Sequence, residues 1–351
     1  MRLLVTGASG FLGREVVRAA AAAGHDVHAL VRPTANVEPL GWPAGVTVVR
    51  GDLRQIGEWA TQLADIEAVA HLAAAPSGDL PTQFAGTVVA TENLLAHLPM
   101  QSLRRFVHVS SFSVYDYGAV GFGGTLTEDT PIEPAPEKRD AYTITKIEQE
   151  RLVVGACQTA GTEFVVIRPG AIVGAGKDWG FGRVIKLGRF DLVFSPGAKF
   201  PLTYVANCAD AIVKALDASV PPGGLFNIVD DELPTYGGFH RLGRRLGGAA
   251  PALYLPWLGV SLLAGSVWVV NRLLFKGRAK LPEFLDRRRQ RVRWQPMSYS
   301  NRAAKDVLGW RPTVPLREAV ERIVGAPPET VSLDADRPRV AASATLAKRG
   351  K

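Results

Sequence analysis

The sequence is poor in cysteine and lacks the patterns typical of zinc and nucleic-acid sites. Its two cysteines, Cys157 and Cys208, stand far apart among 351 residues and need not pair, which suits a reducing compartment. The chain has no zinc-ligand spacing, no Walker loop and no basic helix interleaved with aromatic residues. We therefore expect neither a metal site nor nucleic-acid binding, although the net charge is +8.

A signal sequence is also missing from the start of the chain. Met1 and Arg2 lead straight into a short apolar run, with no longer apolar core and no cleavage site. We expect a cytoplasmic protein. The excess of positive charge is concentrated in the C-terminal third, where it would attract phosphorylated cofactors or substrates. The length allows one large domain or two closely joined ones.

Glycines are concentrated near the N-terminus, where residues 5–13 read VTGASGFLG. Gly7, Gly10 and Gly13 follow a short apolar run and precede a segment, 14–24, that predicts a helix. A strand, a glycine turn and a helix N-terminus together form an anion site, because glycine admits a pyrophosphate close to free backbone N–H groups. An ordinary turn would look similar, but the direct strand-to-helix context favours a dinucleotide site.

Apolar runs alternate with helical patterns through the first half of the chain. This alternation predicts a doubly wound parallel α/β sheet of the Rossmann type, with ligands at the carboxyl ends of its strands. We expect residues 1–170 to form this NAD(P)-binding core. The expected strands are 27–31, 46–49, 68–72, 106–109 and 164–167, and the expected helices include 14–24, 82–98 and 142–157.

The residue at the end of the second strand bears on the choice of cofactor. NAD sites place an acidic side chain about 20 residues beyond the glycines, to bind the ribose 2′-OH. Arg32 stands there instead, and a guanidinium would bind a 2′-phosphate. A solvated arginine at a strand end is the alternative. We favour NADP over NAD. Asp52, just after the third strand, would cap a helix or accept a hydrogen bond from an adenine amino group.

Tyr142 and Lys146 are four residues apart in a predicted helix, so they share one of its faces. A free tyrosine has a pKa near 10, and a nearby ammonium would lower that pKa and make the phenol a usable proton donor and acceptor. Ser111, at the end of the fifth strand, would polarise the same substrate oxygen. This spacing also arises by chance on helix surfaces. Its combination with the glycine turn favours a catalytic group.

These segments resemble the extended short-chain dehydrogenase/reductase superfamily, which includes NAD(P)-dependent epimerases and dehydratases and enzymes similar to 3β-hydroxysteroid dehydrogenase. The resemblance covers roughly residues 1–325. The motifs that carry it are TGASGFLG at 6–13, GDL at 51–53, HLAA at 71–74, SSFSVY at 110–115, YTITK at 142–146, RPGAIVG at 168–174, TYVANCADAI at 203–212 and LGWRP at 308–312.

The resemblance implies roles for individual residues. Tyr142 would be the catalytic acid/base, Lys146 would bind the nicotinamide ribose and lower the pKa of the tyrosine, and Ser111 would orient the substrate oxygen. The glycines would hold the pyrophosphate, and Asp52 with Leu53 the adenine. The full set of expected cofactor contacts is Gly7, Ser9, Gly10, Phe11, Leu12, Gly13, Arg32, Asp52, Leu53, Ala73, Tyr142, Lys146 and Pro169.

Three positions depart from the family pattern. Thr87 stands where an Asn is usual, which puts the structural or proton-relay role of that Asn in doubt. Asp116 replaces the usual glycine after Val-Tyr. Sugar 4,6-dehydratases carry an Asp-Glu pair directly after the Ser/Thr, whereas Phe112 and Ser113 follow here. Dehydratase chemistry is therefore not expected, and Arg32 agrees with NADP-using reductase branches.

We expect 171–325 to be mainly a substrate-binding region, with 203–230 returning to the core. Residues 203–216 and 225–229 look like a helix and a strand that close the small domain. The stretch 175–200 suits two substrate classes: a sugar nucleotide held by Lys and Arg, or an apolar carbonyl or alcohol. The aromatic residues that would hold the apolar class are Trp179, Phe181, Phe190 and Phe194.

The stretch 247–271 contains no charged residue and is followed by Arg272, Lys276, Arg278 and Lys280. Prolines and glycines interrupt it, so a buried helix pair or an interfacial segment competes with a transmembrane helix. Contact with a membrane surface is thus one expected interaction. A run of four arginines at 287–291 is either a solvated face or an anion contact. Residues 326–351 predict a disordered tail.

Three functions compete at this point. The leading one is an oxidoreductase that transfers hydride between nicotinamide and a carbonyl or secondary alcohol, with Tyr142 as acid/base. The second is a nucleotide-sugar epimerase that uses the same Ser/Tyr/Lys set. The third is a non-catalytic NADP-binding sensor, which would not need an acid/base residue. A small-molecule substrate and a homodimer are the partners considered, together with the membrane surface.

Overall fold

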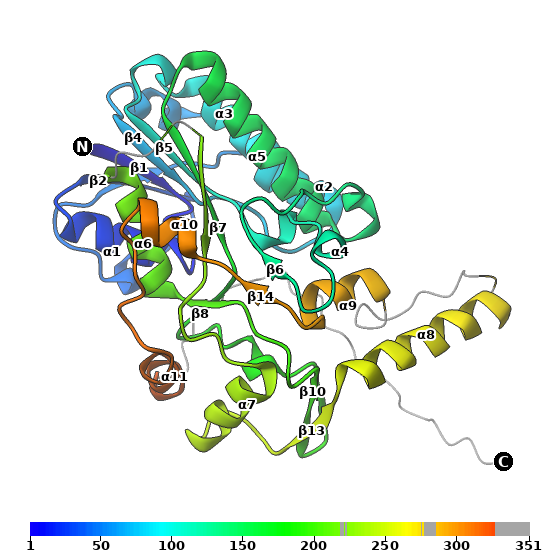
Figure 1. The fold of residues 1–351 in the computed structure, drawn as a ribbon. Helices are drawn as coiled ribbons and strands as arrows, with labels where there is room; N and C mark the ends of the chain where they lie inside the picture. The colour runs from blue at the N-terminus through cyan, green and yellow to red at the C-terminus, as the bar shows by residue number, and fades with distance from the viewer. Residues whose placement is uncertain (218–220, 222, 275, 277–285, 327–351) are drawn as a thin grey trace, which may run out of the picture.

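A seven-stranded parallel sheet forms the centre of the molecule (Figure 1). The computed structural model describes residues 1–217, 221, 223–274, 276 and 286–326, so the expected tail lies outside the described residues from position 327 onward. The strand order is β12-β7-β5-β4-β1-β2-β3, and every pairing in it is parallel. This confirms the predicted Rossmann-type α/β fold. The strands are β1 (Arg2–Thr6), β2 (Asp26–Val31), β3 (Thr47–Arg50), β4 (Ala68–His71), β5 (Arg105–Val109), β7 (Phe164–Pro169) and β12 (Gly224–Ile228).

Helices cover both faces of this sheet, because alternate strand residues point to opposite sides. Leu3 and Val5 of β1 belong to one apolar core, and Leu4 between them belongs to the other. Figure 1 shows α1, α6 and α10 on one side of the sheet and α3 and α5 on the other. The bounds are α1 (Gly13–Ala22), α6 (Val205–Asp217), α10 (Arg302–Val307), α2 (Leu80–Phe84), α3 (Ala90–His97) and α5 (Ala141–Ala160).

The single helix expected over 82–98 is interrupted. A π-helical turn, Ala85–Val89, separates α2 from α3. Gly86 lies close to the loop that follows β4: a Cβ on Gly86 would be 2.8 Å from the Cβ of Ala75. Thr87 Oγ1 accepts a hydrogen bond from the Ala75 N–H (2.9 Å), and Thr91 Oγ1 donates to the Thr87 carbonyl (2.6 Å). The wider turn thus fits the helix against the loop that follows β4.

Residues 205–217 and 224–228 lie with the large sheet, where the sequence places 203–230, and not in the small domain. Pairing with β7 makes β12 the edge strand of the large sheet, and α6 packs against α1. The apolar residues of α6, among them Ile212 and Leu216, lie in the same core as those of β1. The physical reason is that α6 follows β11 of the small sheet directly and leads to β12, so this segment carries the chain back to the large sheet beside β7.

A second, smaller region packs at the carboxyl ends of the strands. It contains a three-stranded sheet, β13-β10-β9, a two-stranded sheet, β11-β8, and its own apolar core. A further pair, β14-β6, joins a late segment to the loop after β5. The bounds are β6 (Thr125–Leu126), β8 (Ala171–Val173), β9 (Ile185–Leu187), β10 (Phe190–Phe194), β11 (Leu202–Tyr204), β13 (Ala252–Leu255), β14 (Ser298–Tyr299), α4 (Tyr117–Val120), α7 (Tyr236–Arg245), α8 (Trp257–Leu274), α9 (Arg287–Trp294) and α11 (Leu316–Gly325).

Short 3-10 helices complete the described chain. They are Glu38–Leu40, Glu58–Leu63, Met100–Ser102, Phe112–Val114, Pro136–Lys138 and Trp179–Gly182. Cys157 and Cys208 are both buried free thiols, as expected from their spacing. Helix α8 differs from the others because it projects from the body of the molecule (Figure 1).

Candidate active site

The glycine turn joins β1 to α1 through a narrow backbone passage. Gly7 has a φ of +65°, and the Gly10 N–H donates to the Gly7 carbonyl (2.9 Å). A Cβ on Gly13 would lie 2.1 Å from that same carbonyl oxygen. In the first turn of α1 the N–H groups of Arg14, Glu15 and Val16 donate to the carbonyls of Gly10 and Leu12 (3.0–3.1 Å), so a pyrophosphate would meet the backbone of the turn that precedes them. This cradle fits the pyrophosphate of a dinucleotide.

Thr6 ties the turn to the neighbouring strand. Its Oγ1 accepts from the N–H groups of Leu72 (3.1 Å) and Ala73 (3.2 Å) and shares a hydrogen bond with His71 Nδ1 (2.7 Å). His71 is fully buried, and burial lowers its pKa to about 3, with the charge of Lys146 acting in the same direction. It is therefore a neutral packing residue. Ala73 lies close to Gly7, whose Cβ would be 3.0 Å from the Ala73 nitrogen.

Charged side chains gather where β2 and β3 end. Arg54 donates hydrogen bonds from its guanidinium to both carboxylate oxygens of Asp52. This contact is the largest cause of the lowered pKa of Asp52, and the charge of Arg32 lowers it further. Arg32 is exposed and follows β2 directly. Two guanidinium groups thus flank one carboxylate at the edge where the adenosine end of a dinucleotide would lie.

A capped helix positions the tyrosine and the lysine. Asp140 accepts a hydrogen bond from the Thr143 N–H (2.7 Å), so α5 begins just before Tyr142. Lys146 is buried one turn later, and its Nζ donates to the carbonyl of Val109 (2.8 Å). Val109 is the last residue of β5, and the chain then leads to Ser111.

The structure brings the three predicted catalytic side chains together. Ser111 is close enough to Tyr142 to lower the pKa of its phenol, and Lys146 is fixed to the end of β5, two residues before Ser111. Ser111 Oγ also accepts from the Ser113 N–H (3.1 Å), which fixes the turn that follows the strand. The Ser113 hydroxyl is buried and has no hydrogen-bond partner among the described residues. It is available to a bound molecule.

The expected lowering of the Tyr142 pKa is wrong in sign. Burial is the largest effect and raises this pKa above its usual value; the Ser111 hydrogen bond opposes the rise, and the charge of Asp140 adds to it. Lys146 itself has its pKa lowered to about 7 by burial, against the opposing charge of Glu150. Tyr142 is therefore protonated at neutral pH, which suits a group that donates a proton.

Gln149 is a site residue that sequence reasoning missed. It is buried one turn after Lys146 on α5 and accepts a hydrogen bond from the lysine Nζ. Its Nε2 lies 2.8 Å from the carbonyl oxygen of Ala73 and 2.9 Å from Thr91 Oγ1. One carboxamide thus joins the lysine to the loop that follows β4 and to α3. The signal in the sequence was a polar residue three positions after the lysine, on the same helix face.

The position of Gln149 bears on the departure at Thr87. The Thr87 hydroxyl holds the Ala75 backbone. The side-chain amide that contacts Lys146 belongs to Gln149. Gln149 lies on α5, whereas Thr87 lies in the π-helical turn between α2 and α3. A carboxamide is thus present beside Lys146 although the usual Asn is absent from the chain at position 87.

A buried ion pair supports the opposite side of α5. Arg168 of β7 donates to Glu150 (Nε to Oε2, 3.1 Å), and its guanidinium lies 4.6 Å from the centre of the Tyr115 ring. The Tyr115 hydroxyl donates to Asn227 Oδ1 of β12 (2.6 Å). Removing one partner of such a buried pair leaves an uncompensated charge, so this network fixes the helix that carries Tyr142. Pro169 follows at the ligand edge of β7.

The substrate side contains fewer of the expected aromatic contacts than predicted. Phe181 and Phe194 are buried in the core of the small region, so they are not lining residues. Phe181 packs on Phe239, and Phe194 packs on Trp294, within that core. Trp179, by contrast, is 40% exposed and is accessible to a substrate.

A basic side chain links this half to the glycine turn. Lys177 Nζ lies 5.4 Å from the centre of the Phe11 ring and 5.7 Å from that of Trp179. Phe11 also contacts Gly174, where a Cβ would lie 2.8 Å from its ring. The stretch after Pro169 therefore packs directly on the predicted cofactor loop. The other aromatic residue named for the substrate, Phe190, is partly exposed on β10.

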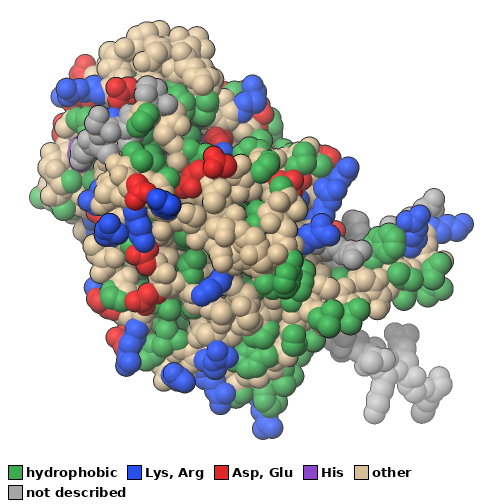
Figure 2. Space-filling view, viewed as in Figure 1, with side chains coloured by type: hydrophobic (Ala, Val, Ile, Leu, Met, Phe, Trp, Pro, Cys, Tyr) green, Lys and Arg blue, Asp and Glu red, His purple; other side chains and the backbone are tan. Residues whose placement is uncertain are grey.

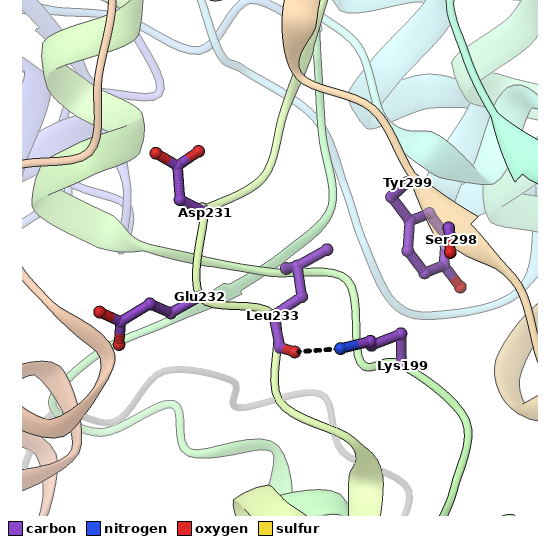
Figure 3. A pocket seen from close by; sticks show the side chains of 6 residues that line it. All are labelled: Lys199, Asp231, Glu232, Leu233, Ser298 and Tyr299. Atoms are coloured by element: carbon purple, nitrogen blue, oxygen red, sulfur yellow. Dashed lines mark hydrogen bonds between the residues drawn. The ribbon is translucent and has the colours of Figure 1, made fainter.

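A cavity of about 340 Å³ lies beyond the carboxyl end of β12. Figure 3 shows Tyr299 and Ser298 of β14 on one side of it and the loop 231–233 on the other. The Tyr299 ring stacks on Phe112, the neighbour of Ser111, with ring centres 5.9 Å apart. None of the proposed catalytic residues lines this cavity. The six lining residues are Lys199, Asp231, Glu232, Leu233, Ser298 and Tyr299.

A doubly wound sheet with a glycine cradle and a Ser/Tyr/Lys group defines the class of NAD(P)-binding Rossmann enzymes. The model of the NAD dependent epimerase/dehydratase family matches residues 3–228, and the chain belongs to this family. The match covers all seven strands of the large sheet, and the small region at the carboxyl edge extends beyond it.

Similar proteins include dehydrogenases and reductases. The chain is 30% identical over 248 residues to the 3-beta-hydroxysteroid dehydrogenase of Mycolicibacterium neoaurum, a match that covers 66% of each protein. It is 27% identical over 338 residues to the 2-alkyl-3-oxoalkanoate reductase of Stenotrophomonas maltophilia, covering 92% of this chain and 98% of that one. Two further curated relatives are matched over 66% and 58% of their length.

Solved structures share the fold at lower identity. The UDP-glucuronic acid 4-epimerase of Bacillus cereus in complex with NAD superimposes with a TM-score of 0.68 at 22% identity, covering 92% of this chain and 96% of that chain. At this identity the likeness shows the fold alone.

Proposed function

We propose that the protein is an NADP(H)-dependent oxidoreductase that transfers hydride between the nicotinamide and a carbonyl or secondary alcohol carbon. One observation carries the proposal: the buried Lys146, one turn after Tyr142 on α5, donates to the carbonyl of Val109 at the end of β5, two residues before Ser111, and Ser111 is close enough to Tyr142 to lower the pKa of its phenol. A protein that only binds a dinucleotide needs no such acid/base group. The cradle at Gly7, Gly10 and Gly13 supports residues 1–170 as the part that holds the cofactor.

The chain's own residues supply the proton and its positioning. When bound, NADPH supplies the hydride that forms the new carbon–hydrogen bond. Ser111 donates a hydrogen bond to the substrate oxygen, and Tyr142 gives its hydroxyl proton to that oxygen as negative charge develops there. Lys146, while protonated, stabilises the phenolate left on Tyr142, and a proton taken up from solvent then restores the phenol; since the pKa of Lys146 is about 7, this amine is able to pass a proton to Tyr142 and take up another. In alcohol oxidation the same transfers run in reverse.

The preference for NADP rests on the charges at the adenosine end. Arg32 supplies an exposed guanidinium, whereas Arg54 and Asp52 are paired with each other. A guanidinium binds a phosphate with charge-assisted, often paired hydrogen bonds. An NAD site would hold the ribose 2′-hydroxyl with an acidic residue, and position 32 is an arginine instead. The family description and the solved structure reported above name NAD, so the preference for NADP rests on these charges alone.

An apolar carbonyl or alcohol is the substrate class we propose. The names of the two relatives given above denote a dehydrogenase of a hydroxysteroid and a reductase of an oxoalkanoate. Trp179, one of the aromatic residues expected to hold an apolar substrate, is 40% exposed. We propose that 171–325, apart from the returning segment 203–230, supplies most of the substrate contacts. A homodimer and a cytoplasmic location stay predictions from the sequence.

The test is a turnover assay of the purified protein with NADPH or NADH and a panel of apolar ketones and UDP-sugars. The proposal expects stoichiometric oxidation of NADPH with at least one apolar ketone. Interconversion of a UDP-sugar without net change in NADPH would show an epimerase instead. Tight cofactor binding with no turnover on either class would show a sensor.

The cofactor preference is tested separately with Arg32→Glu. We expect NADPH affinity to fall about tenfold or more, the size of one lost charge-assisted contact, with NADH affinity little changed. Arg104→Ala is the matched control, since Arg104 precedes β5 at the opposite edge of the sheet. Equal loss of both cofactors in Arg32→Glu, measured by titration, would contradict the NADP preference.

A further inference from the structure

Helix α8 exposes an unusual amount of apolar surface. It has 18 residues with a mean hydropathy of 1.4, long and apolar enough to cross a membrane, yet only 17% of it is buried inside the molecule. Leu258, Leu262, Leu273 and Leu274 are each more than 60% exposed. A helix of this composition inside a globular domain would bury these side chains. Figure 2 shows hydrophobic side chains covering this projecting arm.

The exposed side chains surround most of the helix. The buried positions Val260, Ala264 and Asn271 form one narrow stripe at four- and seven-residue spacing. At 100° per residue the exposed positions, from Leu258 to Leu274, spread over more than half of the circumference. A partner helix covers only a stripe of about 100°. The hydrocarbon layer of a lipid bilayer would cover a much larger part of the exposed surface of α8.

Basic residues adjoin this surface. Arg272 stands in the last turn of α8, with its guanidinium 5.3 Å from the centre of the Trp268 ring. The arginine-rich helix α9 packs beside α8 and contains no acidic residue, and neither does α8. Arg288 and Arg291 of α9 are exposed. Apolar surface with adjoining guanidinium groups matches the interface of a bilayer that contains anionic lipids.

The path of the chain decides between lying on a membrane and crossing it. Helix α8 is about 27 Å long, slightly less than a hydrocarbon core of about 30 Å. After it, α9 is again attached to the body: Arg289 Nε donates to the Arg139 carbonyl (2.8 Å), and the Tyr236 hydroxyl donates to the Arg293 carbonyl (2.5 Å). The segment between the helices, 275–285, is too short for a second crossing.

We propose that α8 is a monotopic membrane anchor that inserts its exposed apolar face into one leaflet of an anionic bilayer, with the exposed Arg288 and Arg291 of α9 at the headgroups. Leu253 and Tyr254 of β13, at 50% and 39% exposure, extend the apolar surface at the base of the helix. The inference does not depend on the reaction proposed above, because none of Ser111, Tyr142 and Lys146 lies on α8 or α9.

The experiment is flotation of the full chain with vesicles of phosphatidylcholine, with and without one quarter phosphatidylglycerol. We expect binding to the anionic vesicles that weakens at high salt. Leu262→Glu with Leu273→Glu should reduce the partition coefficient about a hundredfold, the effect of losing two buried leucines. Val307→Glu is the matched control: Val307 is 44% exposed on α10, which packs on β12 away from α8, and its loss should leave binding unchanged.

Quenching of Trp268 fluorescence is a second readout, which does not use the Leu→Glu variants. Vesicles with brominated acyl chains should quench Trp268 fluorescence, measured as the difference between the native protein and Trp268→Phe. Absence of binding and quenching, or equal binding by the double variant, would overturn the proposal. So would a dimer that dissociates in the double variant without any vesicle binding, because the surface would then belong to a second copy of the chain. Thermal melting of each variant confirms that it is folded.

Discussion

Burial determines the protonation state of Tyr142. Its pKa lies above the usual value because desolvation outweighs the hydrogen bond from Ser111. A group with a raised pKa keeps its proton as the pH rises through neutrality and loses it only in the alkaline range. The phenol is thus a proton donor under ordinary conditions, and ketone reduction is the direction it favours.

This assignment predicts opposite pH profiles for the two directions. Ketone reduction should be steady from slightly acid to neutral pH and fall in the alkaline range, as Tyr142 loses its proton. Alcohol oxidation should rise with pH over that alkaline range, because it needs the phenolate. Steady-state kcat/KM measured in both directions across pH checks this. An alcohol oxidation rate that is already maximal at neutral pH would contradict it.

Gln149 is a positioning residue for the lysine. Because its Oε1 accepts from Lys146 Nζ, it favours the charged form of that amine. Gln149→Leu should lower kcat about tenfold and shift the pH profile, with KM and NADPH affinity little changed. Gln149→Asn should restore part of the loss. Gln158→Leu, an exposed glutamine on the same helix, is the control.

A purely structural role for Gln149 would give a different result. Loss of thermal stability with an unchanged pH profile would show that the carboxamide only holds α5 to the loop at Ala73. This residue shows why the site could be predicted only in part. Ser111, Tyr142 and Lys146 are recognisable from short motifs, whereas the role of Gln149 depends on β4, α3 and α5 meeting at one point.

At the scale of elements, α1 depends on the glycines that precede it. Gly13→Ala would place a Cβ 2.1 Å from the Gly7 carbonyl, so the turn or the helix must shift. We expect NADPH binding weakened at least about tenfold and a free energy of unfolding lowered by about 1–3 kcal/mol. Titration calorimetry and denaturant unfolding measure the two effects.

Gly155→Ala is the matched control for the turn. Gly155 lies in α5, and a Cβ there would meet nothing within 4 Å. Alanine has the higher helix propensity, so this variant should be as stable as the native protein or slightly more stable. If Gly13→Ala bound NADPH as tightly as Gly155→Ala does, the glycine cradle would not be the cofactor site.

Sequence patterns predict well the elements that depend on residues close together in the chain. β1 and α1 follow from an apolar run, three glycines and a helical segment. The π turn between α2 and α3 has a tertiary cause, the close approach of Gly86 to Ala75, which no local pattern contains. The same holds for Phe181 and Phe194, whose burial depends on how the small region folds on itself.

At the scale of the whole molecule, the large sheet could be predicted from alternating strands and helices. The surroundings of α8 could not, because its apolar composition is the same whether the helix is buried, paired or exposed. The sequence alternatives for 247–271 included a buried helix pair, and the structure instead shows β13 followed by one projecting helix. The exposure of Leu258 and Leu273 decides between them.

Hydride transfer assisted by Tyr142 is the claim on which the proposed function rests. The most direct test is the single-turnover rate of NADPH oxidation by Tyr142→Phe with a ketone that the native protein reduces. The substitution removes the transferable proton and keeps the ring, so the rate should fall by about 10²–10⁴, with NADPH affinity and thermal stability unchanged. Full turnover by Tyr142→Phe would contradict the mechanism.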